Sequence, residues 1–330
     1  MKIIIAFFVT LVMAVVMLIS LSGPYTEPPE EIPLPTPSID DLIPQGSRKD
    51  SEMMIRVLFG EDLTEIPLER YLIGAVAAEM PASFEYEALK AQAVAARTNV
   101  LYRIYVAPNS RHPNAQACAD YTCCMAFSTD EALRDRWTDD YIRNVTRVIG
   151  AVLDTDGIYI SYNGEPILAV FHSSSAGKTE ASGNVWVADL PYLVSVDSPE
   201  TQDTVPGYIS TVTVPKNEFA ETIMEVRPDV VFGERVESWI TDIKHSESGR
   251  ITELTIGGAV IRGTELRSMF SLRSTAVTYE WIDGDIVFTV TGYGHGVGMS
   301  QYGANAMAMD RKNYRLILSH YYTDADLAGP

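Results

Sequence analysis

The stretch LERYLIGAVAAEMPASFEYEALKAQAVAARTNVLYRIY, residues 68–105, decides the fold class, because it predicts two helices separated by a proline. We expect the first helix over 68–79, ending near Met80, since proline disfavours a helical residue before it and Pro81 follows. The second is expected over 85–105. There, apolar side chains recur at intervals of three and four and form one stripe: Leu89, Ala93, Ala96, Val100 and Ile104.

The rest of the chain predicts short strands mixed with helices, without the regular alternation that a parallel sheet requires. Strands are expected at 55–59, 158–162, 167–172, 192–196, 209–214, 240–245, 251–256, 276–280 and 286–291. Two C-terminal helices are expected near 301–309 and 314–322. We therefore predict an α+β fold with mixed sheets, two N-terminal helices, and a glycine-rich loop before the C-terminal helices.

Composition narrows the functional class. The 330 residues are 46% hydrophobic, which is enough to bury a full core. There are 44 acidic residues against 25 basic ones, and the formal net charge is −19. A protein that follows a phosphate backbone needs the opposite balance, so nucleic acid is not an expected partner. No internal repeat indicates a solenoid or propeller.

The N-terminal segment predicts a membrane anchor. About twenty residues from Ile3 to Gly23 carry no charge, which is long enough for a helix to cross a bilayer. A cleaved signal peptide is the alternative, but the cleavage pattern near Ser20 is poor. Lys2 favours a cytoplasmic N-terminus. We therefore expect residues 1–23 to form a single-pass anchor in the cell membrane, with the bulk of the chain outside the cytoplasm.

A spacer and one domain are expected to follow the anchor. Residues 24–50 hold seven of the 18 prolines and little apolar content, which is typical of a semi-rigid linker. From residue 51 onward the composition is that of a globular protein. No internal linker divides 51–330, so we predict one extracytoplasmic domain there.

Glu79 at the end of the first helix is a candidate general acid. The negative end of the helix dipole lies there, and apolar neighbours such as Met80 and Phe84 exclude water. Both effects favour the protonated carboxyl group that a general acid needs near neutral pH. A solvent-exposed glutamate at a helix end is the alternative. On the second helix, Gln92 and Arg97 are polar positions among alanines and are expected to line a cleft.

The segment FHSSSAGKTEASGNVW, residues 171–186, is a candidate ligand-binding loop. It lacks the first glycine of a phosphate loop and the surroundings of a hydrolase serine. A strand end with several hydroxyls and a lysine suits hydrogen bonding to a polyhydroxyl ligand, although a plain surface turn is the alternative. The candidate residues are His172, Ser173, Ser175 and Lys178.

The segment TGYGHGVGMSQYGANAMA, residues 291–308, contains four alternating glycines. No frame gives a dinucleotide fingerprint, and such a run is costly in chain entropy unless the backbone turns sharply or approaches another group. Tyrosine rings stack on sugar faces, and histidine and glutamine donate directed hydrogen bonds. The candidates are Tyr293, His295, Gln301 and Tyr302, with a buried structural role as the alternative for His295.

His112, Cys118, Cys123 and Cys124 lie within thirteen residues of one another and suit a closed tetrahedral zinc site. The spacing is not that of a standard zinc finger. A disulfide from Cys118 to Cys123 or Cys124 is the alternative. In either case we expect a structural role, because a closed site has no open position for substrate.

Three segments together resemble the stage II sporulation protein D family, whose members are membrane-anchored lytic transglycosylases of endospore-forming bacteria. They are EMPASFEYEALKAQAVAARTNVLYR, FHSSSAGKTEASGNVW followed by PYLVSVDSPE, and GYGHGVGMSQYGANAMA followed by ILSHYYTDADL. The motifs occur in the family's order, and the resemblance covers roughly residues 51–330.

The resemblance implies roles for individual residues. The family's catalytic acid falls on Glu79, and its two supporting basic residues fall on Arg97 and Lys178. Some members bind zinc through H-x5-C-x4-H-C, which His112, Cys118 and Cys124 match, while Cys123 stands where the family has histidine. Cysteine is also a good zinc ligand. A family glycine after the serines is replaced by Ala176.

The implied reaction is cleavage of the bond between N-acetylmuramic acid and N-acetylglucosamine in peptidoglycan strands stripped of their peptides, which leaves 1,6-anhydro ends. Hydrolases generally need two carboxylates, and no partner for Glu79 is evident, although hydrolysis remains an alternative. Two further alternatives are a non-catalytic glycan-binding enhancer of an amidase and a purely structural anchor. The resemblance implies sporulation proteins P and M as partners, besides the glycan and the membrane.

Overall fold

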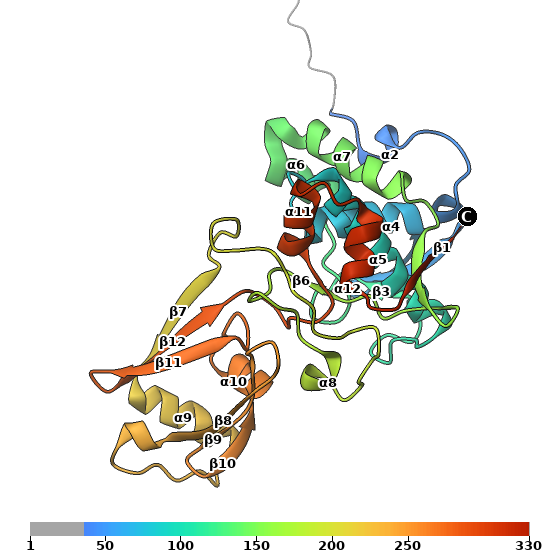
Figure 1. Cartoon of the computed structure of the whole chain (residues 1–330). Coiled ribbons are helices and arrows are strands. Elements are labelled where there is room, and N and C mark those ends of the chain that lie inside the picture. The colour runs from blue at the N-terminus through green and yellow to red at the C-terminus, as the bar shows by residue number, and fades with distance from the viewer. Residues whose placement is uncertain (1–35, 330) are drawn as a thin grey trace, which may run out of the picture. The chain divides into compact units, whose positions relative to one another are not determined.

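The structure is a computed structural model that describes residues 36–329, and its elements confirm the α+β class (Figure 1). The helices are α2 (Ile39–Leu42), α3 (Lys49–Glu52), α4 (Leu68–Glu79), α5 (Tyr86–Tyr105), α6 (Asp130–Trp137), α7 (Tyr141–Leu153), α8 (Ser182–Val185), α9 (Lys216–Val226), α10 (Gly263–Met269), α11 (Gln301–Met309) and α12 (Tyr314–Tyr321). The strands are β1 (Met54–Phe59), β2 (Asp62–Pro67), β3 (Ala117–Cys118), β4 (Tyr159–Tyr162), β5 (Glu165–Pro166), β6 (Phe171–His172), β7 (Ile209–Val214), β8 (Ile240–His245), β9 (Ile251–Ile256), β10 (Ala259–Arg262), β11 (Val277–Ile282), β12 (Asp285–Thr291), β13 (Met299–Ser300) and β14 (Asp326–Ala328).

The folded part of the chain begins before residue 51. The short helix α2 lies within the residues assigned to the linker, α3 begins there, and Asp50 is buried. The expected anchor, Ile3–Gly23, lies outside the described residues. Between residues 36 and 329, no helix combines the length and the apolar character needed to span a bilayer.

α5 is the central element of the first hydrophobic core. It packs against α4, α7, α11 and α12. The sequence predicted one apolar stripe, but buried residues occur all around this helix, from Ala88 to Leu101. Its many alanines explain the difference, because small side chains let neighbouring helices approach from several directions. α4 ends at Glu79 as predicted, with Met80 as its C-cap.

Several elements differ from the prediction. α7 was not predicted, although its buried Tyr141, Val145, Val148 and Val152 recur at three and four positions. The expected strand at 192–196 is a loop, which accepts single backbone hydrogen bonds from Thr179 and Ser182, and an isolated bridge between Lys178 and Asp197 follows it. Of the expected strand 167–172, only the last two residues form β6.

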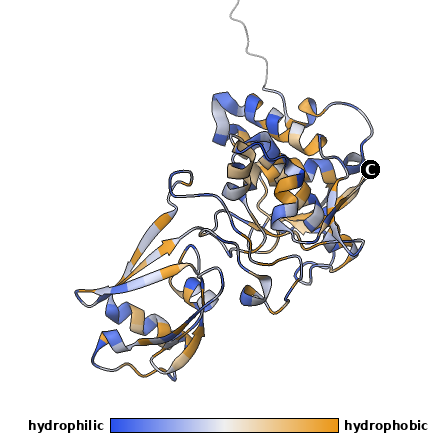
Figure 2. Cartoon of the chain, viewed as in Figure 1, coloured by the Kyte–Doolittle hydropathy of each residue, from blue (hydrophilic) through white to orange (hydrophobic). Residues whose placement is uncertain are grey.

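A second hydrophobic core lies between two antiparallel sheets. One sheet has the strand order β10-β9-β8 and the other β11-β12-β7. α9 and α10 contribute Phe219, Ile223 and Leu266 to this core. Figure 2 shows hydrophobic positions in these strands as well as in the grouped helices of the first core.

Two parts of the chain that are distant in sequence meet at the first core. β6 pairs in parallel with β13, so that His172 lies opposite Ser300. An antiparallel bridge joins Ser174 to Tyr293. The hydroxyl-rich segment and the glycine-rich loop singled out in the sequence therefore form one continuous wall.

Candidate active-site cleft and metal-ligand cluster

Glu79 is half-buried at the end of α4. The backbone N–H of Ala126 donates a hydrogen bond of 2.7 Å to its Oε1. Burial raises the pKa of the Glu79 carboxyl group, while the Ala126 N–H and the side chain of Gln301 offset part of this rise. The carboxyl group is thus held in place and favoured in its protonated form, as a general acid requires.

Glu79 lies where two cavities meet. The cavities have volumes of about 310 and 590 Å³, and both are lined by Glu79, Ser173 and Gln301. We call the smaller one the histidine cavity, because His172 and His295 line it, and the larger one the Tyr302 cavity. Together they form a cleft that extends to both sides of the carboxyl group, as a polymeric ligand requires.

The glycine-rich loop lies close against the strand that leads to His172. Gly298 has a φ of +71°, and a Cβ atom there would lie 2.1 Å from the carbonyl oxygen of Val170. Gly294 has a φ of +116°, and its Cβ would lie 2.7 Å from Cβ of His172. Both the backbone conformation and the lack of space therefore require glycine. These contacts explain the alternation seen in the sequence.

Both imidazoles of the histidine cavity are uncharged at neutral pH. Burial lowers the pKa of His172 well below its usual range, and burial with the nearby Arg267 charge lowers that of His295 to about 4. His172 donates from Nδ1 to the carbonyl oxygen of Val297 at 3.1 Å. Its Nε2 then accepts from the Ser175 hydroxyl at 2.7 Å. His172 thus holds the two segments of this wall together.

A buried carboxylate supports the same wall from behind. Glu200 accepts hydrogen bonds from the backbone N–H of Ser175 and from the hydroxyls of Ser198 and Ser300. The Ser198 hydroxyl also contacts the Tyr321 hydroxyl at 2.8 Å. Glu200 ends the segment PYLVSVDSPE, but its role was not predicted, because its partners Ser175 and Ser300 come from distant parts of the chain.

The structure brings most of the predicted site residues together. Six of them line the cleft beside Glu79: His172, Ser173, Tyr293, His295, Gln301 and Tyr302. Ser175 is fully buried behind the wall and reaches the cleft only through His172. The motifs from both ends of the domain thus converge on one carboxyl group.

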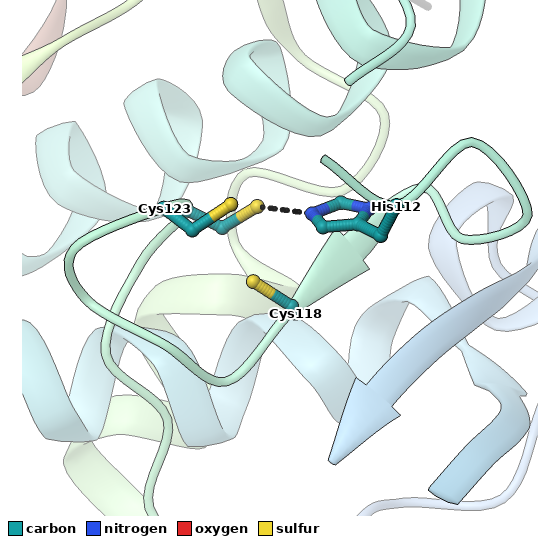
Figure 3. A group of neighbouring side chains, drawn as sticks. His112, Cys118 and Cys123 are labelled. Atoms are coloured by element: carbon teal, nitrogen blue, oxygen red, sulfur yellow. Dashed lines mark hydrogen bonds between the residues drawn. The ribbon is translucent and has the colours of Figure 1, made fainter. Parts of the chain in front are cut away.

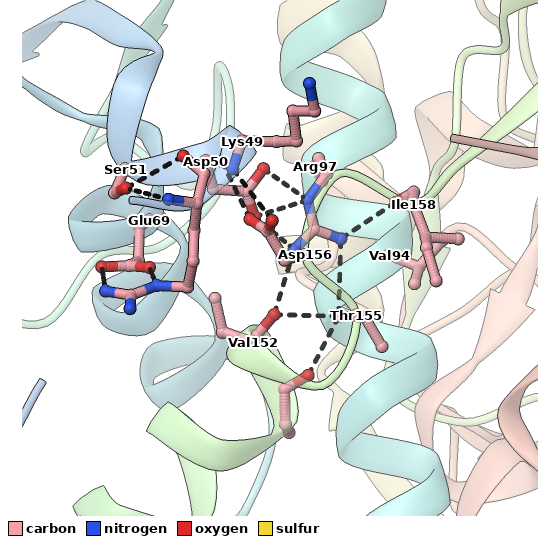
Figure 4. A network of polar contacts seen from close by, with 12 residues as sticks. Lys49, Asp50, Ser51, Glu69, Val94, Arg97, Val152, Thr155, Asp156 and Ile158 are labelled. Carbon is pink, nitrogen blue, oxygen red and sulfur yellow. Dashed lines mark hydrogen bonds and ion pairs between the residues drawn. The ribbon is translucent and has the colours of Figure 1, made fainter. Parts of the chain in front are cut away.

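Arg97 does not line this cleft, contrary to the prediction. Its guanidinium is fully buried and forms an ion pair with Asp50, with Nη2 2.6 Å from Oδ2 (Figure 4). It also donates to the backbone carbonyl of Ile158 at 2.9 Å. A side chain held in this way connects α5 to the N-terminal segment and has no free donor for a ligand in the cleft.

Gln92 and Lys178 also lie apart from the cleft. Gln92 is fully buried in α5, where its amide has no hydrogen-bond partner among the described residues. Lys178 is exposed and lies 3.5 Å from the carboxylate of Asp197. Polar side chains on this alanine-rich helix therefore did not indicate a cleft, because other helices cover α5 on several sides.

Several cleft residues were not predicted. They include Asn99 and Arg267 in the histidine cavity, and Arg136, Trp137 and Arg143 in the Tyr302 cavity. Arg267 comes from α10 of the second core, far in sequence from every motif. No local pattern could have indicated it.

The four predicted metal ligands form one cluster beside the cleft. The ligand atoms of His112, Cys118, Cys123 and Cys124 all lie within 4.8 Å of one another (Figure 3). All three cysteines are free thiols in the structure.

The donor set fits a tetrahedral zinc ion. His112 donates from Nδ1 to the Ala115 carbonyl at 3.1 Å, which leaves Nε2 directed at Cys124 Sγ, 3.2 Å away. Asn109 donates to Cys123 Sγ at 3.3 Å. Burial raises the pKa of the Cys123 thiol, but hydrogen bonds from Arg111 and Asn109 outweigh this and lower it to about 7. One ligand is thus readily available as a thiolate.

The cluster and the cleft share a loop. Cys124 and Met125 line the histidine cavity, and the next residue, Ala126, donates its N–H to Glu79. A metal that fixed this loop would therefore also fix the hydrogen bond to the carboxyl group. The position of the cluster therefore couples it to the site.

Comparison with known proteins identifies the family. The model of the stage II sporulation protein family SpoIID matches residues 61–162. Stage II sporulation protein D of Bacillus amyloliquefaciens is 37% identical over 264 residues, which cover 80% of this chain and 74% of that protein. The chain belongs to the stage II sporulation protein D family.

Two further relatives extend the comparison. The family member from Bacillus subtilis is 36% identical over 81% of this chain and 76% of its own length. A protein of Bacillus subtilis named amidase enhancer is 28% identical over 78% of this chain and 40% of its own length. Family membership and these names support a cell-wall role in sporulation.

Proposed function

We propose that this protein is a lytic transglycosylase that cleaves the bond between N-acetylmuramic acid and N-acetylglucosamine in peptide-stripped glycan strands. The observation that supports it most directly is Glu79, half-buried at the junction of two cavities, with a raised carboxyl pKa. A strand lying across both cavities would pass this group in mid-chain. Tyr293 and Tyr302 offer rings against which sugars would stack.

One carboxyl group would serve both steps of the reaction. Protonated Glu79 gives its proton to the glycosidic oxygen as the bond from muramic acid C1 to that oxygen breaks. The resulting carboxylate then takes the proton from the muramic acid 6-hydroxyl as O6 bonds to C1. The products are a free 4-hydroxyl on N-acetylglucosamine and a 1,6-anhydro ring, and Glu79 ends protonated.

The remaining carboxylates favour this mechanism over hydrolysis. Among the described residues that line the two cavities, Asp140 is the other carboxylate, and it lies 2.9 Å from Arg143 in an ion pair. An inverting hydrolase needs a free second carboxylate to activate water. We therefore expect Asp140→Asn to keep the same products.

The cellular setting is part of the proposal. The uncharged segment Ile3–Gly23 would anchor the protein in the cell membrane, with the cleft outside the cytoplasm. Tethering would supply the local concentration that an acidic protein does not gain by charge on an anionic wall. The partners expected from the family are sporulation proteins P and M, and the cysteine cluster would hold a structural zinc ion.

Product analysis tests the reaction. The full chain in mild detergent is incubated with peptide-free glycan strands, and the products are analysed by mass spectrometry alongside those of Glu79→Gln. We expect 1,6-anhydro ends that disappear in the variant. Reducing ends that disappear in the variant would instead indicate a hydrolase.

A non-catalytic amidase enhancer is the second candidate, because a relative with that name aligns over 78% of this chain. It predicts that neither form cleaves glycan, that both bind it, and that both stimulate an amidase equally. If glycan cleavage depends on Glu79, the protein is not solely a non-catalytic amidase enhancer.

A further inference from the structure

Arg267 is an uncompensated cation in the histidine cavity. It projects from α10, is half-buried, and lines the cavity together with Glu79. Its Nε donates to the backbone carbonyl of Leu272 at 3.2 Å, which fixes the side chain. Within residues 36–329, its two terminal nitrogens make no hydrogen bond or ion pair with the protein. A fixed guanidinium edge is therefore free for a ligand.

The arginines of the Tyr302 cavity are already engaged. Arg136 donates to the Ala77 carbonyl and to the Ser128 hydroxyl, both at 3.2 Å. Arg143 pairs with Asp140. Arg143 is thus paired with a carboxylate, and both terminal nitrogens of Arg136 already donate to the protein, whereas the terminal nitrogens of Arg267 are left for a ligand.

No nearby carboxylate cancels this charge. Glu79 is the only carboxyl-bearing residue among the described residues that line the histidine cavity, and its environment favours the neutral form. The two histidines are uncharged. Arg250 lies behind the glycine-rich loop, with its guanidinium carbon 2.8 Å from where a Cβ on Gly296 would be. In a chain of net charge −19, this cavity is a local site for an anion.

The proposed substrate offers one suitable anion. Each muramic acid carries a lactyl ether that ends in a carboxylate when the peptide has been removed. In an intact strand the same carbon is an amide and has no charge. A guanidinium binds a carboxylate through two parallel hydrogen bonds, which an amide cannot match. The N-acetylglucosamine units have no charged group.

We propose that Arg267 binds the free lactyl carboxylate of a muramic acid unit in the histidine cavity and so makes the cleft selective for peptide-stripped strands. This inference rests on the proposed function, because it assumes that a glycan strand occupies the cleft. Arg267 is then a specificity residue, and the removal of peptides by an amidase is the reaction that creates its ligand.

The test separates charge from size. Peptide-free strands are compared with the same strands after their lactyl carboxylates have been converted to primary amides, which removes the charge with almost no change in volume. We expect kcat/KM of the full chain to be about 10- to 100-fold higher on the carboxylate form, as for a hydrogen bond to a charged group. Equal rates on the two forms would overturn the proposal without any variant.

Variants assign the preference to Arg267. Arg267→Gln should lose about 10- to 100-fold on carboxylate strands and change little on amide strands, while Arg267→Lys retains part of the preference. Arg262→Gln removes the same charge from an exposed position next to α10 and should keep the preference. An equal loss on both substrates in Arg267→Gln would indicate a merely structural role.

Binding distinguishes this inference from the proposed reaction. In a Glu79→Gln background, calorimetry measures the affinity for both strand forms without turnover. Preference for the carboxylate form that is lost in Glu79→Gln/Arg267→Gln supports Arg267 even if no cleavage is detected. If the Glu79→Gln chain binds both forms equally, the assignment fails, whatever the products of the active protein.

Discussion

Glu79 combines a fixed position with an environment that opposes its ionisation. Burial raises the pKa of the Glu79 carboxyl group in the folded protein. Above the usual pKa of 4.5, this group therefore ionises more readily in the unfolded chain than in the folded one. The folded state therefore loses stability as the pH rises through that value. The same burial that would suit the proposed general acid makes the folded protein less stable at neutral pH.

We expect Glu79→Gln to raise the melting temperature at pH 7, because the amide cannot ionise, so the unfolded variant lacks the stabilisation that ionisation gives the unfolded wild-type chain, and the amide still accepts from Ala126. The gain should shrink towards pH 4, where the native carboxyl group is protonated as well. Thermal melts of both proteins at the two pH values measure the difference. A variant that is less stable at pH 7 would contradict the assigned burial.

Arg97 contributes to stability rather than to ligand binding. Burial raises the pKa of Asp50, and the Arg97 charge lowers it in turn, so each side chain depends on the other. Arg97→Met would leave the Asp50 carboxylate buried without its positively charged partner.

We expect Arg97→Met to reduce the free energy of unfolding by about 3–5 kcal/mol, as when one member of a buried ion pair is removed. The double variant Asp50→Asn/Arg97→Met should recover much of this loss. Urea unfolding measures the three values. A stable Arg97→Met protein with weakened glycan binding would instead place Arg97 at the ligand.

At the scale of elements, α4 and the loop after the cysteines fit closely. Gly74 of α4 faces the ring of Phe127, and a Cβ atom on Gly74 would lie 2.3 Å from it. The adjacent Ala126 holds Glu79. Any displacement of Phe127 therefore moves the hydrogen bond on which the carboxyl group depends.

Gly74→Ala should destabilise the fold by about 1–3 kcal/mol through overpacking and should lower kcat more than it raises KM. Gly233→Ala is the matched control, since a Cβ there meets only the Ser238 hydroxyl at 3.8 Å. Urea unfolding and steady-state kinetics measure both variants. Equal effects of the two substitutions would argue against this coupling.

The same loop responds to metal. We expect the purified protein to carry about one zinc per chain. Chelation should lower both the melting temperature and the cleavage rate, because the metal would no longer hold the loop from Cys118 to Ala126 in place. Metal analysis, thermal melts and restoration by added zinc measure this. Unchanged stability after complete removal would contradict a structural role.

At the scale of the whole molecule, the sequence predicts what is encoded locally. α4 ends at Glu79 because Pro81 follows, and the alternating glycines mark a close backbone contact. Arg97, Glu200 and Arg267 were misplaced or missed because their roles depend on distant partners: Asp50, Ser300 and the opposite wall of the cleft. The second core was predicted only as separate strands, since no local pattern reports which sheets face each other.

The parallel pairing of β6 with β13 has a consequence for how the protein folds. Its partners are separated by more than a hundred residues, so the loop-closure cost of joining them is high, whereas α4 and α5 need only local contacts. During refolding, helical signal should therefore return before glycan binding does. A chain in synthesis would therefore hold Glu79 on a formed helix but lack the cleft, and with it the proposed activity, until β13 has been made.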